Sequence, residues 1–204
     1  FSCRFMEGAI FGGGGNAVFG PDVLLGLAFL NSKLVNVLSR ILNPTLNVLV
    51  GDILRMPFID SDPRFEKVRQ NTKQLIEIAS ADWNTQETSI GFSRLDLVDQ
   101  SMQGLEAART AVRSHRSDQR QAMKALEEEN NCIFADVYGL TGEISPDVED
   151  GAISLFVRSR ADDCLRLVSY AVGCMMGRYS LGAPGLIYAE AASAGFDPSQ
   201  YRSD

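Results

Sequence analysis

The sequence predicts a mainly α-helical protein, with a small β-hairpin and short-strand portion at the N-terminus that makes the class α+β. Three observations lead to this prediction. Long parts of the 204-residue chain have the apolar spacing of helices, above all residues 101–131 and 161–176. The first 20 residues instead alternate around the glycine run Gly12–Gly15, as two strands joined by a turn do. Proline and glycine clusters separate these patterns.

The N-terminal part begins with the predicted hairpin, over residues 1–20. A helix should follow from Pro21 or Asp22, because proline fits a first helical turn and aspartate caps it. This helix should end near Leu42, because Asn43-Pro44 follows and proline disfavours helical geometry in the residue before it.

A short strand is expected next, over residues 46–50, with Gly51-Asp52 as a turn. The strongest break follows at residues 60–63, Asp-Ser-Asp-Pro, which combine a helix cap with a proline at the first helical position. We therefore predict two regions, residues 1–60 and residues 61–204.

The second region is expected to be a helical module. A helix should run from Pro63 to Ala81, and the single Trp83 after it is expected to anchor the core. The helix over 161–176 is apolar nearly all round, which is typical of a buried helix, and Gly177 should end it. The other expected features are a long helix over 101–131, a connector over 140–146, and a short strand or helix lead-in over 152–157.

Composition excludes some classes of function. The net charge of −7 is a poor match for DNA over the whole surface, although it leaves room for a local basic strip. No pair of cysteines has the spacing of a zinc site, so reduced cysteines in the cytoplasm and no bound metal are expected. No apolar run reaches the roughly 20 residues that cross a bilayer. The cysteines are Cys3, Cys132, Cys164 and Cys174.

Two short motifs look like methyltransferase machinery. Phe11–Gly15 fits the Phe-x-Gly-x-Gly pattern of an S-adenosylmethionine loop, but no strand–helix–strand unit follows, so we predict a hairpin turn. Asn43-Pro44 is followed by Thr45-Leu46, where adenine methyltransferases have proline and an aromatic ring that stacks on the flipped base. We predict a helix stop there. Two acidic runs, Glu127–Glu129 and Asp162-Asp163, are expected at the surface and at a helix cap.

Five basic residues recur every three or four positions along the long predicted helix. At 100° per residue they fall within about 80° of one another and form a strip about 22 Å long, which suits a phosphate backbone. The alternative is a solvated face, partly balanced by neighbouring acids. His115 on the same helix is expected to pack toward its apolar side. The DNA-contact candidates are Arg109, Arg113, Arg116, Arg120 and Lys124.

Four stretches of the chain resemble adenine-specific DNA methyltransferases of the BREX or phage-growth-limitation type, which are similar to type IIG restriction-modification enzymes. The first runs from Leu30 to Pro57, with Leu-Asn-Ser-Lys, Leu-Asn-Pro-Thr-Leu-Asn, Val-Gly-Asp-Ile and Met-Pro in order. The others are Asp82–Asn84 with Glu87–Ser89, Leu126–Asn131 with Ile133-Phe134 and Tyr138–Leu140, and Ser169–Leu181 with Gly185–Ala189.

The resemblance implies a parent enzyme whose N-terminal domain binds S-adenosylmethionine and methylates adenine N6 in duplex DNA. This chain would lie after that domain, at the end of the target-recognition region and in the helical part beyond it. No catalytic and no cofactor-binding residue has a counterpart here. The chain starts at Phe1 and stops at Asp204 as if cut, so we expect a fragment. The alternatives are a scaffold that docks other defence proteins without touching DNA, and a piece of a nuclease-methyltransferase.

Overall fold

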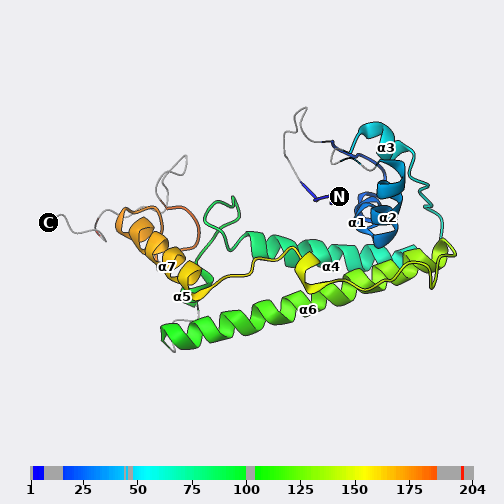
Figure 1. Ribbon diagram of the computed structural model, residues 1–204. Helices are drawn as coiled ribbons and strands as arrows, with labels where there is room; N and C mark the ends of the chain where they lie inside the picture. Colours follow the sequence, from blue (N-terminus) through cyan, green and yellow to red (C-terminus); the bar gives the residue numbers. More distant parts are fainter. Residues whose placement is uncertain are drawn as a thin grey trace. The chain divides into compact units, whose positions relative to one another are not determined.

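The computed structural model describes residues 2–6, 16–43, 45, 48–99, 104–187 and 199, and these are mainly helical (Figure 1). They divide into two compact units, each built from two chain segments. Unit 1 holds residues 1–78 and 121–153, and unit 2 holds residues 79–120 and 154–204. The helices are α1 (Val23–Asn31), α2 (Lys33–Leu42), α3 (Val50–Leu54), α4 (Phe65–Trp83), α5 (Asp96–Asp99), α6 (Leu105–Val137), a 3-10 turn (Asp150–Ala152) and α7 (Arg160–Met175).

The core of unit 1 is built around three phenylalanines from three helices. Phe29 of α1, Phe65 of α4 and Phe134 of α6 are almost completely buried. Their ring centroids lie 5.9 Å apart for Phe29 and Phe134, and 5.6 Å apart for Phe65 and Phe134. Tyr138 stacks on Phe29 at 6.1 Å. Aromatic rings bury large areas, so this cluster packs α1, α4 and α6 together in this unit.

The predicted helix from Asp22 to Leu42 is broken in two at Ser32. Ser32 is extended and buried, and its hydroxyl accepts a hydrogen bond from the Val35 amide at 3.2 Å, so it caps α2. Asn131 of α6 fixes the break, because its side-chain oxygen accepts from the Lys33 amide at 2.9 Å. Periodicity alone could not predict the break, since the apolar pattern continues across it. The helix ends at Leu42 with Asn43 as its cap, as predicted.

A second polar contact joins α4 to α6 in unit 1. The Asn71 side chain is fully buried and donates to Asn130 at 3.0 Å and to Glu129 at 2.8 Å. The neighbouring Thr72 hydroxyl donates to the Val68 carbonyl at 2.6 Å. Buried amides need such partners, so the contact specifies the register of the two helices as well as their proximity.

The predicted β structure near the N-terminus is not supported. Residues 2–6 and 16–20 form no strand, and the glycine turn Gly12–Gly15 lies outside the described residues. The predicted strand over 46–50 is also wrong where it is described, because Val50 already begins α3 and Gly51-Asp52 lies inside that helix. The Asp52 carboxylate accepts from the Leu49 amide at 2.9 Å, which stabilises the first turn of α3. Only an isolated bridge between Thr141 and Ile144 has β pairing among the described residues.

Unit 2 packs three aromatic rings against the C-terminal half of α7. The Tyr170 and Tyr179 rings stack with centroids 5.1 Å apart, and Phe92 meets Tyr179 edge-on at 5.3 Å. Gly173 leaves room for this cluster, since a Cβ at that position would come within 2.5 Å of the Tyr179 ring. Gly177, with φ of 75°, lies just beyond the end of α7 and donates to the Cys174 carbonyl, as predicted for a helix stop.

The other predicted helices are found with small shifts in their bounds. The helix predicted over 63–81 is α4 and the one over 101–131 is α6. Residues 152–157 form no strand: Ala152 ends the 3-10 turn, and the rest leads into α7, as in one of the two predictions. The two compact units do not follow the predicted division at residue 60, since each combines distant segments. Whether residues 1–60 and 61–204 differ in function stays a prediction.

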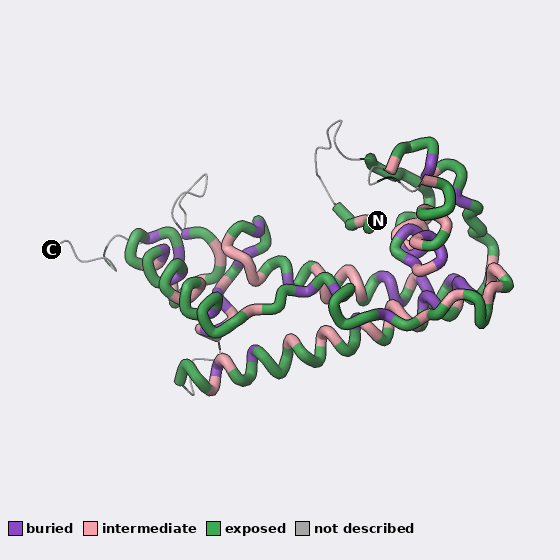
Figure 2. The backbone as a smooth tube through the Cα atoms, in the orientation of Figure 1, coloured by how far each residue is buried: buried purple, intermediate pink, exposed green. Residues whose placement is uncertain are grey.

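The prediction that α7 is a buried helix is wrong for one of its faces. Tyr170 and Gly173 are buried, but Leu165 is 69% exposed and Met175 is 80% exposed. Figure 2 accordingly colours much of α7 green. The sequence shows that the helix is apolar nearly all round, but it cannot show which part of the chain covers each side.

No single described helix is both long and apolar enough to cross a membrane. The pair α1 and α2 passes that test together, although it is bent by 67° at Ser32. Leu25, Phe29 and Val35 of this pair are buried in the core of unit 1, so the apolar character has an explanation in packing.

Candidate functional site: the basic face of the long helix and its aspartate partners

The five predicted DNA-contact residues all lie on α6, but in two different units. Arg109, Arg113, Arg116 and Arg120 belong to unit 2, whereas Lys124 belongs to unit 1. Their charges therefore have separate local environments, and the hydrogen bonds within each unit decide how much of each charge faces solvent.

Arg109 is bound to the buried Asp163, and Arg116 is bound to Asp96, which is partly buried. The Arg109 Nε donates to the Asp163 carboxylate at 3.3 Å, and a terminal nitrogen of Arg116 donates to Asp96 at 2.5 Å. A second Arg116 nitrogen lies 3.6 Å from Asp163. The two arginine side chains are only 16% and 12% exposed. Hydrogen bonds between a guanidinium and a buried carboxylate are strong, so these two arginines tie α6 to α5 and α7 in unit 2.

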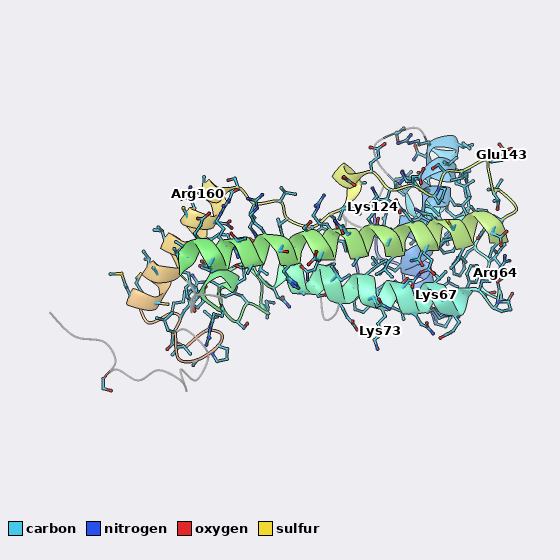
Figure 3. All side chains as sticks on the ribbon, turned by 90° about the horizontal axis from the view of Figure 1, so that it is seen from below. Arg64, Lys67, Lys73, Lys124, Glu143 and Arg160 are labelled. Atoms are coloured by element: carbon cyan, nitrogen blue, oxygen red, sulfur yellow. The ribbon has the colours of Figure 1, made fainter. Side chains whose placement is uncertain are left out.

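The next two members of the strip are also occupied. Arg120 is partly buried and donates to the Leu155 carbonyl at 3.3 Å. Lys124 donates to Asp150 at 2.8 Å, beside the 3-10 turn seen in Figure 3. This hydrogen bond raises the pKa of Lys124, so the lysine stays charged at any ordinary pH.

Arg113 is the exception. Its side chain is exposed, and within the described part of the chain it has neither a hydrogen bond nor an ion pair. A phosphate would meet this charge without breaking any internal bond. The prediction of DNA contact by the strip stays a prediction, and Arg113 is the member whose charge faces solvent most freely.

The acid that organises this region was misread from the sequence. Asp163 was expected at the surface or at a helix cap, but its side chain is only 4% exposed and it also lies 3.6 Å from Arg166. Its neighbour Asp162 does lie at the helix start, where it completes a capping box with the cap residue Ser159. The Asp162 carboxylate accepts from the Ser159 amide at 2.8 Å, and the Ser159 hydroxyl accepts from the Asp162 amide at 3.2 Å. These bonds lower the pKa of Asp162. Asp163 and Arg166 are three residues apart on one predicted helix, so the sequence could have predicted that they lie close enough to form an ion pair.

A second buried pair extends the charged cluster. Arg158 is 5% exposed and lies 3.9 Å from Asp82, which is 6% exposed, and it donates to the Thr85 hydroxyl at 2.7 Å. The pKa of Arg158 is lowered to about 10, chiefly by burial and also by the nearby charges of Arg166 and Arg116. The cluster is formed by Arg109, Arg116, Arg158 and Arg166 with Asp82, Asp96 and Asp163.

A pocket of about 220 Å³ lies next to this cluster, within unit 2. The charged groups that line it, Asp82, Asp96 and Arg116, already bind each other or other members of the cluster. His115 also lines it but is exposed, so the prediction of a packed histidine is wrong. On α6 the residue that faces inward after Val112 is Arg116, four positions later. Arg116, in its ion pair with Asp96, therefore occupies the side of the helix on which His115 was predicted to pack.

Trp83 is not the predicted core anchor. Its side chain is 48% exposed and its ring stacks on Phe156 at 6.2 Å. Arg158 lies over the Phe156 ring, 5.1 Å from its centre. Trp83 is therefore linked to the charged cluster through Phe156.

The stretches that resemble methyltransferases meet one another in space. In unit 1, the Tyr138 hydroxyl donates to the Pro57 carbonyl at 2.5 Å, besides the Lys33–Asn131 bond described above. In unit 2, Ser169 donates to Glu87 at 3.1 Å, and the Tyr179 hydroxyl donates to the same carboxylate at 3.4 Å. The first stretch thus contacts the third, and the second contacts the fourth, which is expected if the resemblance reflects a shared fold.

No protein-family model matches the chain. The adenine-specific methyltransferase PglX of Lacticaseibacillus casei (strain Zhang) is 34% identical over 212 residues, which cover 100% of this chain and 17% of the relative. The adenine-specific methyltransferase BrxX of Escherichia coli O9:H4 (strain HS) is 32% identical over 218 residues, which cover 96% of this chain and 18% of the relative. The chain thus matches one segment of the BREX-type adenine-specific methyltransferases. It spans less than one fifth of these two relatives.

The described residues do not fit a binding site for S-adenosylmethionine. Methyltransferase domains hold this cofactor at the carboxyl ends of parallel strands, and the described residues contain no such strands. The glycine run that matches a cofactor loop lies outside the described residues, so its assignment as a turn stays a prediction. Among the described residues, no three His, Cys, Asp or Glu side chains are placed to hold a metal ion.

Proposed function

We propose that this chain is a non-catalytic part of an adenine-N6-specific DNA methyltransferase that acts in phage defence or restriction-modification. In that enzyme it would form the end of the target-recognition region and the helical module that follows it. The observation that carries the proposal is the match along the whole chain to two such methyltransferases, each more than five times as long. The methyl donor S-adenosylmethionine and the duplex DNA substrate would both belong to the parent enzyme.

The state of Asn43 supports a non-catalytic role. An asparagine that binds the adenine amino group must present a free side-chain amide to the base. Here the Asn43 nitrogen donates to Asp52 at 2.7 Å, and its oxygen accepts from the Thr45 hydroxyl at 2.6 Å and from the Thr45 amide at 3.0 Å. Both ends of the amide therefore hold the link between α2 and α3, which supports a structural role for Asn43.

The test is Asn43→Ala in the parent protein, with N6-methyladenine in the host genome read by single-molecule sequencing. We expect adenine methylation to persist at the same sites, with at most a loss in proportion to the amount of folded protein. Asp52→Ala breaks the same link from its other end and serves as the matched control. Complete loss of methylation in Asn43→Ala, with normal methylation in Asp52→Ala, would contradict the non-catalytic assignment.

DNA contact through α6 is the more specific part of the proposal, and its support comes from Arg113. In a gel-shift titration against duplex DNA, Arg113→Ala should reduce the dependence of log K on log salt by about 1, because one phosphate contact releases about one counterion. Arg116→Ala is unsuitable for this purpose, since it removes a buried ion pair and its effect would report folding. No binding by the unchanged protein at low salt would exclude the DNA contact.

The alternative is a docking scaffold in a defence complex, with no DNA contact. The exposed apolar face of α7 is compatible with it, because such faces mark contacts with other proteins as well as with other parts of the same protein. An unchanged salt slope in Arg113→Ala, together with stable assembly of the parent protein with other chains, would support this alternative.

A further inference from the structure

The outward face of α7 consists of apolar side chains only. At 100° per residue, eight positions of α7 and its cap residue fall on the side opposite Tyr170 and Asp163, within about 140° of one another. All eight are exposed, and no polar residue interrupts them. They are Ala161, Cys164, Leu165, Val168, Ala171, Val172, Met175 and Met176.

This face is unusual for a helix surface that is exposed to solvent. A helix at a protein surface normally has charged or polar residues on its outer side, and scattered apolar residues there need no explanation. Here Leu165 is 69%, Val168 61% and Met175 80% exposed, and they adjoin one another on successive turns. A contiguous apolar patch of this kind marks a contact with another protein surface.

The spacing within the face indicates the kind of surface that covers it. Leu165, Val168, Val172 and Met175 are separated by three, four and three residues, which is the pattern of the central seam in helices packed side by side. Side chains with this spacing interlock with a second helix that crosses at about 20°. The chemical partner is therefore an apolar helix, because nothing in the face would pair with a charge or a phosphate.

We infer that the outward face of α7 docks an apolar helix from another part of the same methyltransferase polypeptide. The inference rests on the proposed function, since it requires a longer parent chain. Two facts favour the same polypeptide over a second copy or a separate protein. More than four fifths of each relative lies outside the matched segment, so ample chain exists to supply the helix. The face is also small.

The area of the α7 face is smaller than that of a stable interface between separate proteins. Sixteen residues of α7 give a seam about 24 Å long, and one helix side of that length offers only a few hundred Å². A stable association between separate proteins buries about 800 Å² on each partner. A contact of less than that size holds when both sides are joined by the same chain, because their effective concentration is high.

Oxidative footprinting of the complete parent methyltransferase tests the inference. Hydroxyl radicals should modify Leu165 and Val172 at least about tenfold more slowly than exposed aliphatic residues, because a packed interface excludes solvent. The matched references are Val157, 80% exposed, and Ile90, which is fully exposed, both outside the α7 face. The protection of the α7 face from oxidation should not change when the protein is diluted from micromolar to nanomolar concentration.

Other outcomes overturn the inference. Equal modification of the face and the references means that the face is open. Protection that disappears on dilution assigns the face to a second copy, and protection that disappears when residues 188–204 are deleted assigns it to that segment. Adenine methylation by the same preparation is measured in parallel. Its presence without protection refutes this inference alone, whereas its absence from the host genome refutes the proposed function.

A double variant supplies a second reading. Val168→Asp with Val172→Asp should lower the melting temperature of the parent enzyme by several degrees, because two charges would enter an apolar contact. The change Val157→Asp adds one such charge at a valine that is exposed outside the α7 face, and it should have almost no effect. Equal effects of the two changes would argue against a covered α7 face.

Discussion

The substitution of glycine by alanine should change the free energy of unfolding in opposite directions at two helical glycines. Gly173 of α7 faces Tyr179, and an added Cβ would lie 2.5 Å and 2.7 Å from two ring carbons. Gly26 of α1 has no atom within 4 Å of the corresponding position. In an open helical site, glycine to alanine is stabilising by about 1 kcal/mol, because alanine loses less backbone freedom on folding.

The magnitude at Gly173 follows from what the ring can do. Tyr179 is 1% exposed, is stacked on Tyr170 and meets Phe92 edge-on, so it has no free space to enter. Overpacking a tight core costs about 1–3 kcal/mol, and contacts this short favour the upper end. Subtracting the helix gain of about 1 kcal/mol leaves Gly173→Ala destabilised by about 2 kcal/mol, whereas Gly26→Ala gains about 1 kcal/mol.

Thermal unfolding followed by circular dichroism separates these cases. For a chain of this size 1 kcal/mol corresponds to about 2–4 °C, so Gly173→Ala should melt about 4–8 °C lower and Gly26→Ala about 2–4 °C higher. Adding Tyr179→Leu should remove most of the penalty of Gly173→Ala, because the obstructing ring is gone. A melting temperature of Gly173→Ala at or above that of the unchanged protein would show that the ring does not pack on this glycine.

Three further changes probe the polar interior. Asp163→Asn should cost about 3 kcal/mol in urea unfolding, because it leaves Arg109 short of a buried counter-charge; an effect below 1 kcal/mol would place the pair in solvent. Asn131→Ala should cost about 1–3 kcal/mol, since it deprives the Lys33 amide of its partner, and an unchanged midpoint would disprove that role. Burial raises the pKa of Glu127 to about 7. The native state thus favours the protonated acid, and the resulting stability, complete below about pH 4.5, is lost as pH rises through 7. Glu127→Gln should therefore be more stable than the unchanged protein at pH 8 and equally stable at pH 4. A constant difference in stability across this pH range would refute the raised pKa of Glu127.

Local signals in the sequence were sufficient for most helices. Asn43-Pro44, Pro63 and Gly177 act through the backbone of their immediate neighbours, so they place helix ends without knowledge of the fold. The break at Ser32 was missed because it depends on Asn131, almost 100 residues later. The alternation around the N-terminal glycines suggested strands, but alternation forms strands only where a partner and a covered face exist.

In the candidate site, too, the sequence predicts local features but not long-range contacts. Spacing alone places the basic residues of α6 close together along the helix, but it cannot show which of them turn toward an acid. Arg109 and Arg116 are neutralised by Asp163 and Asp96, which lie 54 and 20 residues away in sequence. Arg113 differs from them only in its partners. Reading a basic stripe as a nucleic-acid contact therefore requires knowledge of the tertiary acids that compete with phosphate.

The division of each unit between distant chain segments has a consequence for synthesis on the ribosome. The Phe29 and Phe65 side chains emerge early, but the ring that completes their cluster, Phe134, follows about 70 residues later. At about 5–20 residues per second, these apolar surfaces stay uncovered for roughly 4–14 seconds. Nascent chains that stop between α4 and the end of α6 carry an open core and are natural clients for chaperones. Useful truncations of this protein should therefore begin before α1 and extend beyond residue 153.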